Sequence, residues 1–150
     1  MSDMHDTSKL DDLIVTLIDS IKGYEHSAEK AEAGRYRDFF ADMARERREA
    51  VALLQAASRA EGGTPADYGS AAATLHRRFE DLRAALGGGD AAIVKEVDHG
   101  ENYLKEEFDR VLADERMSPA AMNAVREAYA SVRRGHDQAS ALKKQLESAD

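Results

Sequence analysis

The most informative absences in this sequence are those of cysteine, tryptophan and long apolar runs. With no cysteine among its 150 residues, the chain cannot form disulfides or thiolate metal sites. Two prolines, no tryptophan and abundant Ala, Glu, Arg and Leu favour an all-helical chain. No apolar run approaches the roughly 18 residues of a membrane span, and the first residues lack the apolar core of a signal peptide. We therefore expect a cytoplasmic protein that does not interact with a membrane.

Positive charge is also scarce. The chain has 29 acidic against 21 basic residues, giving a net charge of -8, and neither sign forms a long block. Because a nucleic-acid site needs a basic face that neutralises phosphates, nucleic acid is not an expected partner. The sequence also lacks a glycine-rich phosphate loop and a nucleophile elbow. A homodimer and an unidentified protein partner are left open.

The clearest element that is present is a core-facing helix over residues 90–115, with Asp90 as its expected cap. Apolar residues recur there at the three- and four-residue spacing of a buried helical stripe: Val94, Val97, Leu104, Phe108, Val111 and Leu112. Glu101 lies in the same stripe, about 40° from Val97 around the helix. A carboxylate in a low-dielectric core must be paired, protonated or bound to a metal, because an isolated charge there costs many kcal/mol.

Helical periodicity covers most of the chain. A disordered tail is expected over residues 1–8 and a single domain over residues 9–150, with Thr7 or Ser8 capping the first long helix. A short turn around Gly34 makes the first two long helices an antiparallel hairpin. The four long helices are expected at about residues 8–34, 35–59, 90–115 and 119–147.

A shorter helix is predicted over residues 70–86, in the connection between the second and third long helices. A Gly- and Pro-containing loop over residues 61–69 precedes it, and three glycines at 87–89 end it. His76 lies at the edge of this helix, and its role is left open. Four long helices with such a crossover predict an all-α, ferritin-like antiparallel four-helix bundle, in which the second and third long helices are parallel.

Polar residues at inward positions of this bundle are expected to meet at one level. Glu25 lies on the apolar face of the first helix, where Tyr24 is the alternative inward residue, and His136 takes an inward position on the last helix. Counted in residues from one end of the bundle, the expected positions of Glu25 and His136 differ by about 3 Å along its axis. The second helix adds Arg47 on its inward face and Glu46 beside it.

Two interpretations of this polar layer are open. In the first, Arg47 bridges Glu25 and Glu101 while His136 hydrogen-bonds a carboxylate, and the protein is non-enzymatic, with a structural or interaction role. In the second, Glu25, Glu46, Glu101 and His136 hold one divalent metal ion, which would be iron, manganese or zinc. The first is favoured, because a cation at Arg47 opposes metal binding.

A complete di-iron oxidase centre is not expected. Such sites take one Glu from each of two helices and Glu-x-x-His from each of the other two. The second helix here has no histidine, and Arg133 replaces Glu three residues before His136. The one Glu-x-x-His, from Glu96 to His99, points away from the core. No cofactor is therefore assigned beyond the alternative divalent metal.

Short motifs in a particular order resemble a known family. They are GYE at Gly23–Glu25, a GS-x-HR-like element at Gly69–Arg78, the GE pair ending at Glu101, and HD at His136-Asp137. Their order over residues 10–146 resembles an uncharacterised bacterial four-helix-bundle family, a domain of unknown function grouped with the ferritin-like superfamily. The resemblance implies a ferritin-like fold and a stress-related or metal-related role.

Overall fold

The computed structural model describes residues 2–68 and 89–148. Within these ranges the chain is all-α and contains no strand, as the sequence predicted. Its four long helices are α1 (Ser2–Lys30), α2 (Gly34–Ala60), α4 (Gly89–Leu112) and α5 (Pro119–Ser148). The helix predicted over residues 70–86, together with His76, lies outside the described residues. None of the described helices is long and apolar enough to cross a membrane.

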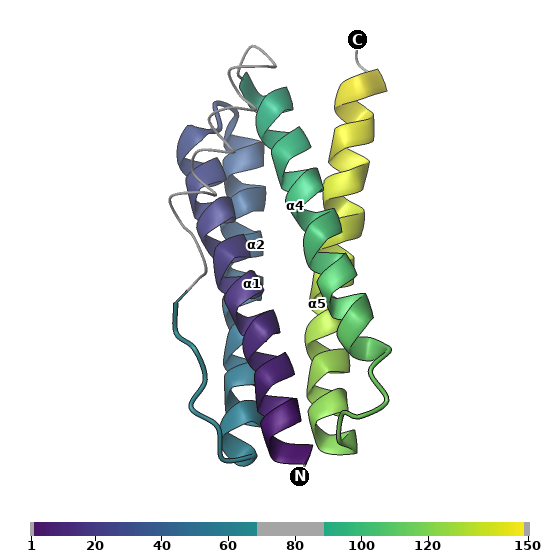
Figure 1. Ribbon diagram of the computed structural model, residues 1–150. Coiled ribbons are helices and arrows are strands. Elements are labelled where there is room, and N and C mark those ends of the chain that lie inside the picture. The colour runs from purple at the N-terminus through teal and green to yellow at the C-terminus, as the bar shows by residue number, and fades with distance from the viewer. Residues whose placement is uncertain (1, 69–88, 149–150) are drawn as a thin grey trace.

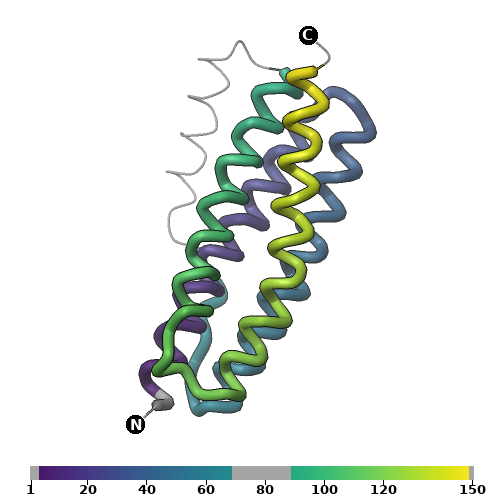
Figure 2. The backbone as a smooth tube through the Cα atoms, turned by 90° about the vertical axis from the view of Figure 1, so that its right-hand side faces the viewer, coloured from purple at the N-terminus to yellow at the C-terminus, as the bar shows by residue number. Residues whose placement is uncertain are grey.

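The four helices pack as an elongated bundle (Figures 1 and 2). Helix α1 contacts α2 and α4, and α5 contacts α4 and α2, so that α2 and α4 lie across one diagonal. Helix α2 ends at one end of the bundle, and α4 begins at the opposite end (Figure 1). Helices α2 and α4 are therefore parallel, and the four neighbouring pairs, α1–α2, α2–α5, α5–α4 and α4–α1, are antiparallel.

The apolar faces of the helices form two core clusters rather than one. The cluster nearer the N-terminus includes Leu10, Leu54, Phe108 and Val125. The other cluster includes Tyr24, Tyr36, Phe40, Met43, Ile93 and Val94. Along α2, the buried residue between the two clusters is Arg47. Along α4, the buried residues between them are Asp98 and Glu101. A polar layer thus divides the core across its width.

Helix α1 begins earlier than expected. Residues 2–8, for which the sequence predicted a disordered tail, form its first turns. Tertiary contacts hold them there, because His5 Nε2 lies 2.6 Å from Asp114 Oδ2 and Asp6 Oδ1 accepts a 3.1 Å hydrogen bond from the Ser118 N–H. These partners lie more than 100 positions away in the sequence, so the local pattern could not show them.

Asp90 has a different role from the cap that the sequence suggested. Its two carboxylate oxygens accept hydrogen bonds from the backbone N–H groups of Glu32, at 2.8 Å, and Ala33, at 3.1 Å. Ala33 occupies the N-cap position of α2 and has no side-chain cap of its own. The start of α4 therefore supplies hydrogen-bond acceptors to the α1–α2 turn and holds that end of the bundle together.

Candidate functional site

The centre of the polar layer is an ion pair between Arg47 and Glu101. The Arg47 Nη2 to Glu101 Oε2 distance is 2.7 Å, and the two side chains are 0% and 2% exposed. Because α2 and α4 lie across a diagonal, this contact passes through the middle of the bundle. The sequence prediction that Arg47 contacts Glu101 is confirmed.

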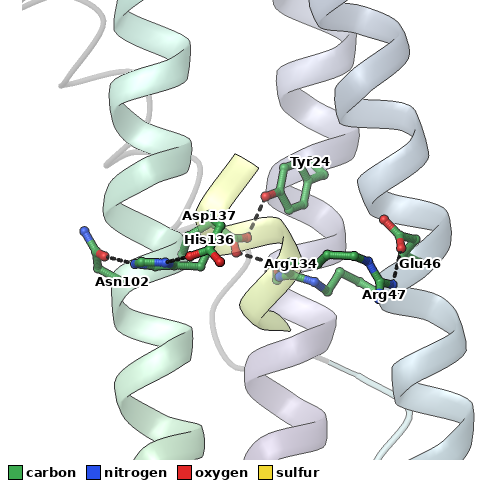
Figure 3. Close-up of polar contacts among 9 residues, drawn as sticks. Tyr24, Glu46, Arg47, Asn102, Arg134, His136 and Asp137 are labelled. Carbon is green, nitrogen blue, oxygen red and sulfur yellow. Dashed lines mark hydrogen bonds and ion pairs between the residues drawn. The ribbon is translucent and has the colours of Figure 1, made fainter. Parts of the chain in front are cut away.

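Tyr24 completes the surroundings of the Glu101 carboxylate. Its hydroxyl donates a 2.6 Å hydrogen bond to Glu101 Oε1, so each carboxylate oxygen has its own buried donor. The Arg47 guanidinium carbon also lies 5.6 Å from the centroid of the Tyr24 ring, within cation–π range. Figure 3 shows Tyr24 on α1 and Arg47 on α2 pointing toward the middle of the bundle.

Hydrogen bonds and burial fix the protonation states within the layer. Burial lowers the pKa of Arg47, but the negative charge and hydrogen bond of Glu101 raise it, and the net direction is upward. Burial raises the pKa of Tyr24 well above its ordinary value, and the charge of Glu101 raises it further. Arg47 therefore stays a cation and Tyr24 stays a neutral donor. Arg47 Nη1 also donates to Ser20 Oγ at 2.9 Å.

Helix α5 leaves room for the layer, because its residue at this level, Gly135, has no side chain. A Cβ added to Gly135 would lie 2.3 Å from Arg47 Nη2 and 2.4 Å from Met43 Cε, closer than real Cβ contacts allow. The same Cβ would lie 3.3 Å from Glu101 Oε2. Sequence reasoning missed Gly135, although its position three residues after Val132 and four before Ala139 is a core spacing that could have identified it.

The predicted positions of Glu25 and Glu46 in this layer need correction. Glu25 is about half exposed and pairs with Arg48 rather than with Arg47. Glu46 pairs with Arg134 of α5, with 2.6 Å between Oε1 and Nη2. Neighbouring residues on a helix differ by about 100° in direction, and Tyr24, not Glu25, is the one that faces the core.

His136 also lies outside the layer. Its Nε2 is 2.7 Å from Asn102 Oδ1 on α4, and its Nδ1 is 3.2 Å from Asp137 Oδ1 (Figure 3). Gly135 takes the inward position that the sequence assigned to His136, so the imidazole lies to one side, between α5 and α4.

The four predicted metal ligands are therefore not brought together. Glu25, Glu46, Glu101 and His136 have four separate sets of partners. Over residues 2–68 and 89–148, no group of three or more His, Asp or Glu side chains is arranged to hold a metal ion. The donor set around Glu101 is a guanidinium and a phenol, which donate hydrogen bonds and do not fit a metal.

A shallow groove of about 320 Å³ lies elsewhere, between α2 and α5. Its lining residues are Arg35, Tyr36, Phe39, Gln138, Ala141, Leu142 and Gln145. None of them belongs to the polar layer. The groove combines apolar and amide side chains with the Arg35 guanidinium, and its lining contains no nucleophile paired with a base.

Comparison with known proteins assigns the chain to a family without assigning an activity. The model of a domain of unknown function, DUF2383, matches residues 6–114, which include most of α1 and all of α2 and α4. No curated protein and no solved structure matches the chain. The match contains Tyr24, Arg47 and Glu101 and ends before α5. Because it spans more than half of the sequence, the chain belongs to the DUF2383 family.

Proposed function

We propose that this protein is a non-enzymatic structural or interaction protein built on a ferritin-like four-helix bundle. The observation that supports this most directly is the position of Arg47. Ferritin-like metal proteins project ligands into the bundle core from facing helices. Here the corresponding space holds a guanidinium that is 0% exposed and paired with Glu101. The cation that pairs with Glu101 at the centre of the bundle is thus a side chain of the protein itself.

The alternative of a divalent metal at this level has a physical obstacle. Both oxygens of Glu101 already accept short hydrogen bonds, from Tyr24 and Arg47. A metal at Glu101 would have to displace both donors and would leave Arg47 buried without its counter-charge. Breaking a buried pair in this way costs about 3–5 kcal/mol. No contact among the described residues offsets that cost.

The layer is suited to fixing the arrangement of the helices. A buried ion pair adds little net stability, but it disfavours any helix register in which one of its charges would lack a partner. Tyr24, Arg47, Glu101 and Gly135 come from four different helices, so sliding or rotating any one helix breaks a contact of the layer. Such a bundle presents defined outer faces to a protein partner. The stress-associated role implied by the family resemblance and the cytoplasmic location expected from the sequence complete the proposal.

Elemental analysis of tag-free protein, with thermal melts before and after chelator treatment, tests this proposal. We expect no stoichiometric iron, manganese or zinc and an unchanged melting temperature. Stoichiometric metal with a chelator-sensitive melt would contradict the proposal. Glu101→Gln should then abolish the metal effect, whereas Glu25→Gln, a change in an exposed pair, should leave it intact.

A further inference from the structure

Two neighbouring residues at the start of α1 form polar contacts with the loop between α4 and α5 (Figure 1). His5 Nε2 lies 2.6 Å from Asp114 Oδ2, so the carboxylate of this contact belongs to the loop. Asp6 Oδ1 accepts the Ser118 N–H at 3.1 Å, so the carboxylate of the second contact belongs to α1. Each segment therefore supplies one carboxylate and one donor. We call these two contacts, His5 with Asp114 and Asp6 with Ser118, the clasp.

The first turns of α1 have little apolar anchoring. Of residues 4–9, only Asp6 is buried, and Met4 is 81% exposed. The first residue of α1 in either apolar core cluster is Leu10. Local stability is lowest where few apolar side chains are buried. The attachment of the first turns therefore depends largely on polar contacts, whereas the helix from Leu10 onward is held by the core.

We propose that the clasp is an acid-sensitive switch, which releases the first turns of α1 when Asp6 and Asp114 become protonated. A protonated Asp114 no longer carries the charge that pairs with His5. A protonated Asp6 is a weaker acceptor for the Ser118 N–H, because hydrogen bonds to an ionised acceptor are the stronger ones. The helix then frays as far as Leu10, while the apolar core and the polar layer stay folded. This switch would regulate one end of the bundle and goes beyond the structural role proposed above.

The pKa values of both carboxyl groups are shifted in the direction that such a switch requires. Burial raises the pKa of Asp6, but its hydrogen bonds and the charge of His5 lower it, and the net direction is downward. The pKa of Asp114 is also lowered, most by the hydrogen bond from the Arg116 N–H and further by the hydrogen bond and charge of His5. A carboxyl group with a lowered folded pKa stabilises the fold above its unfolded pKa of about 3.9, and this stability is lost as pH falls through the folded pKa. The clasp is therefore closed at neutral pH and opens below about pH 4.

Charged groups on the neighbouring elements also face the clasp. On the loop, Arg116 Nε lies 3.6 Å from Asp114 Oδ1. At the end of α2, Glu61 accepts a 2.9 Å hydrogen bond from the Ser118 hydroxyl. Histidines ordinarily lose their proton near pH 6.5, so measurements between pH 3 and pH 5.5 follow the carboxyl groups. Glu61 is the group whose titration could imitate that of the clasp.

Carbon-13 chemical shifts of the full chain, measured by NMR between pH 5.5 and pH 3, test the switch. The Cα shifts of residues 4–9 report the helical population of the first turns, and those around Arg47 and Glu101 report the rest of the bundle. In the parent protein we expect residues 4–9 to lose roughly half or more of their helical shift at pH 3, while the polar layer keeps its own. The double variant Asp6→Asn with Asp114→Asn should show the same helical shift at every pH, because neither side chain can titrate. Asp114→Asn alone should reduce the pH dependence, which keeps the test usable if the double variant folds poorly.

Two matched variants separate the clasp from its surroundings. Glu61→Gln keeps an oxygen that accepts from Ser118 but cannot titrate, and it should retain the pH dependence of the parent. Glu25→Gln, in a distant exposed pair with Arg48, should retain it as well.

Three results would overturn the proposal. The first is a constant helical shift of residues 4–9 in the parent down to pH 3. The second is a pH dependence that persists in the double variant or disappears in Glu61→Gln, since another group would then control the release. The third is simultaneous loss of the helical shifts throughout the bundle, because acid would then unfold the whole protein and not the clasp alone.

Discussion

Arg47 and Glu101 face each other across the diagonal of the bundle, with 2.7 Å between Nη2 and Oε2 and almost no contact with solvent. The pair lies between two apolar clusters, so it interrupts what would otherwise be one continuous core. Replacing a buried ion pair with apolar residues of similar volume is often neutral or stabilising. The pair therefore acts mainly by restricting how the helices can pack, and it contributes less to the stability of the bundle.

Glu101→Gln should destabilise the metal-free protein by about 3 kcal/mol, because it leaves the buried Arg47 cation without its counter-charge. The double variant Arg47→Met with Glu101→Leu should recover most of this loss, since neither charge remains. Urea denaturation measures both free energies of unfolding. The matched control is Glu25→Gln in the exposed pair with Arg48, for which we expect a change below about 1 kcal/mol. Unchanged or increased stability of Glu101→Gln would favour the metal interpretation instead.

Two glycine-to-alanine substitutions should have opposite effects. A Cβ at Gly135 would press on Arg47 Nη2, which is held in place by Glu101, so Gly135→Ala should destabilise the bundle by about 1–3 kcal/mol. Gly100 is also inside a helix, but an added Cβ meets nothing within 4 Å there. Gly100→Ala should therefore stabilise by about 0.5–1 kcal/mol, from helix propensity alone. Thermal and urea unfolding of the two variants compare them directly, and equal effects would show that α5 does not approach the guanidinium closely.

Tyr24 should resist ionisation at alkaline pH. Its pKa is raised in the folded state by burial and by the charge of Glu101. A raised folded pKa gives stability that is fully present below the unfolded tyrosine pKa of about 10 and is lost as pH rises through the folded pKa. Absorbance at the tyrosinate band should show one tyrosine that ionises only as the protein unfolds. Tyr24→Phe should lack this ionisation on unfolding. If the variant still shows it, the ionising residue is another tyrosine.

Asp90→Ala should loosen the end of the bundle formed by the α1–α2 turn and the start of α4. The substitution removes the acceptor for the N–H groups of Glu32 and Ala33, and losing such a cap costs about 1 kcal/mol. Asp90→Asn keeps one acceptor oxygen and should lose about half as much. Hydrogen exchange at Ala33 reports the effect locally. Unchanged protection of Ala33 in Asp90→Ala would show that these hydrogen bonds do not persist in solution.

The local periodicity of apolar residues was sufficient to predict much of the fold. The apolar spacing on each segment predicted four long helices, and it identified Arg47 and Glu101 as charged residues on inward faces. The long connection between the second and third helices predicted that these two are parallel, as α2 and α4 are. These inferences succeed because a helix repeats every 3.6 residues, so the pattern of one segment shows its own buried face.

Which neighbours complete the polar layer was decided by tertiary structure. On α1 the spacing left Tyr24 and Glu25 open, and on α5 the sequence assigned the inward position to His136 and missed Gly135. Both outcomes arise because steps of three and four residues each continue an apolar stripe. Only the packing of four helices around one guanidinium selects Tyr24 as the donor and Gly135 as the position without a side chain.

The sequence by itself therefore determined the helices, their buried faces and the presence of two opposite charges in the core. The tertiary structure alone decided the contacts of Asp6 and Asp90, whose carboxylates accept hydrogen bonds from residues far along the chain. The physical reason is that helix formation depends on residues three and four apart. A carboxylate's hydrogen-bond donors depend instead on which segments fold against it, and that is set by the packing of the whole bundle.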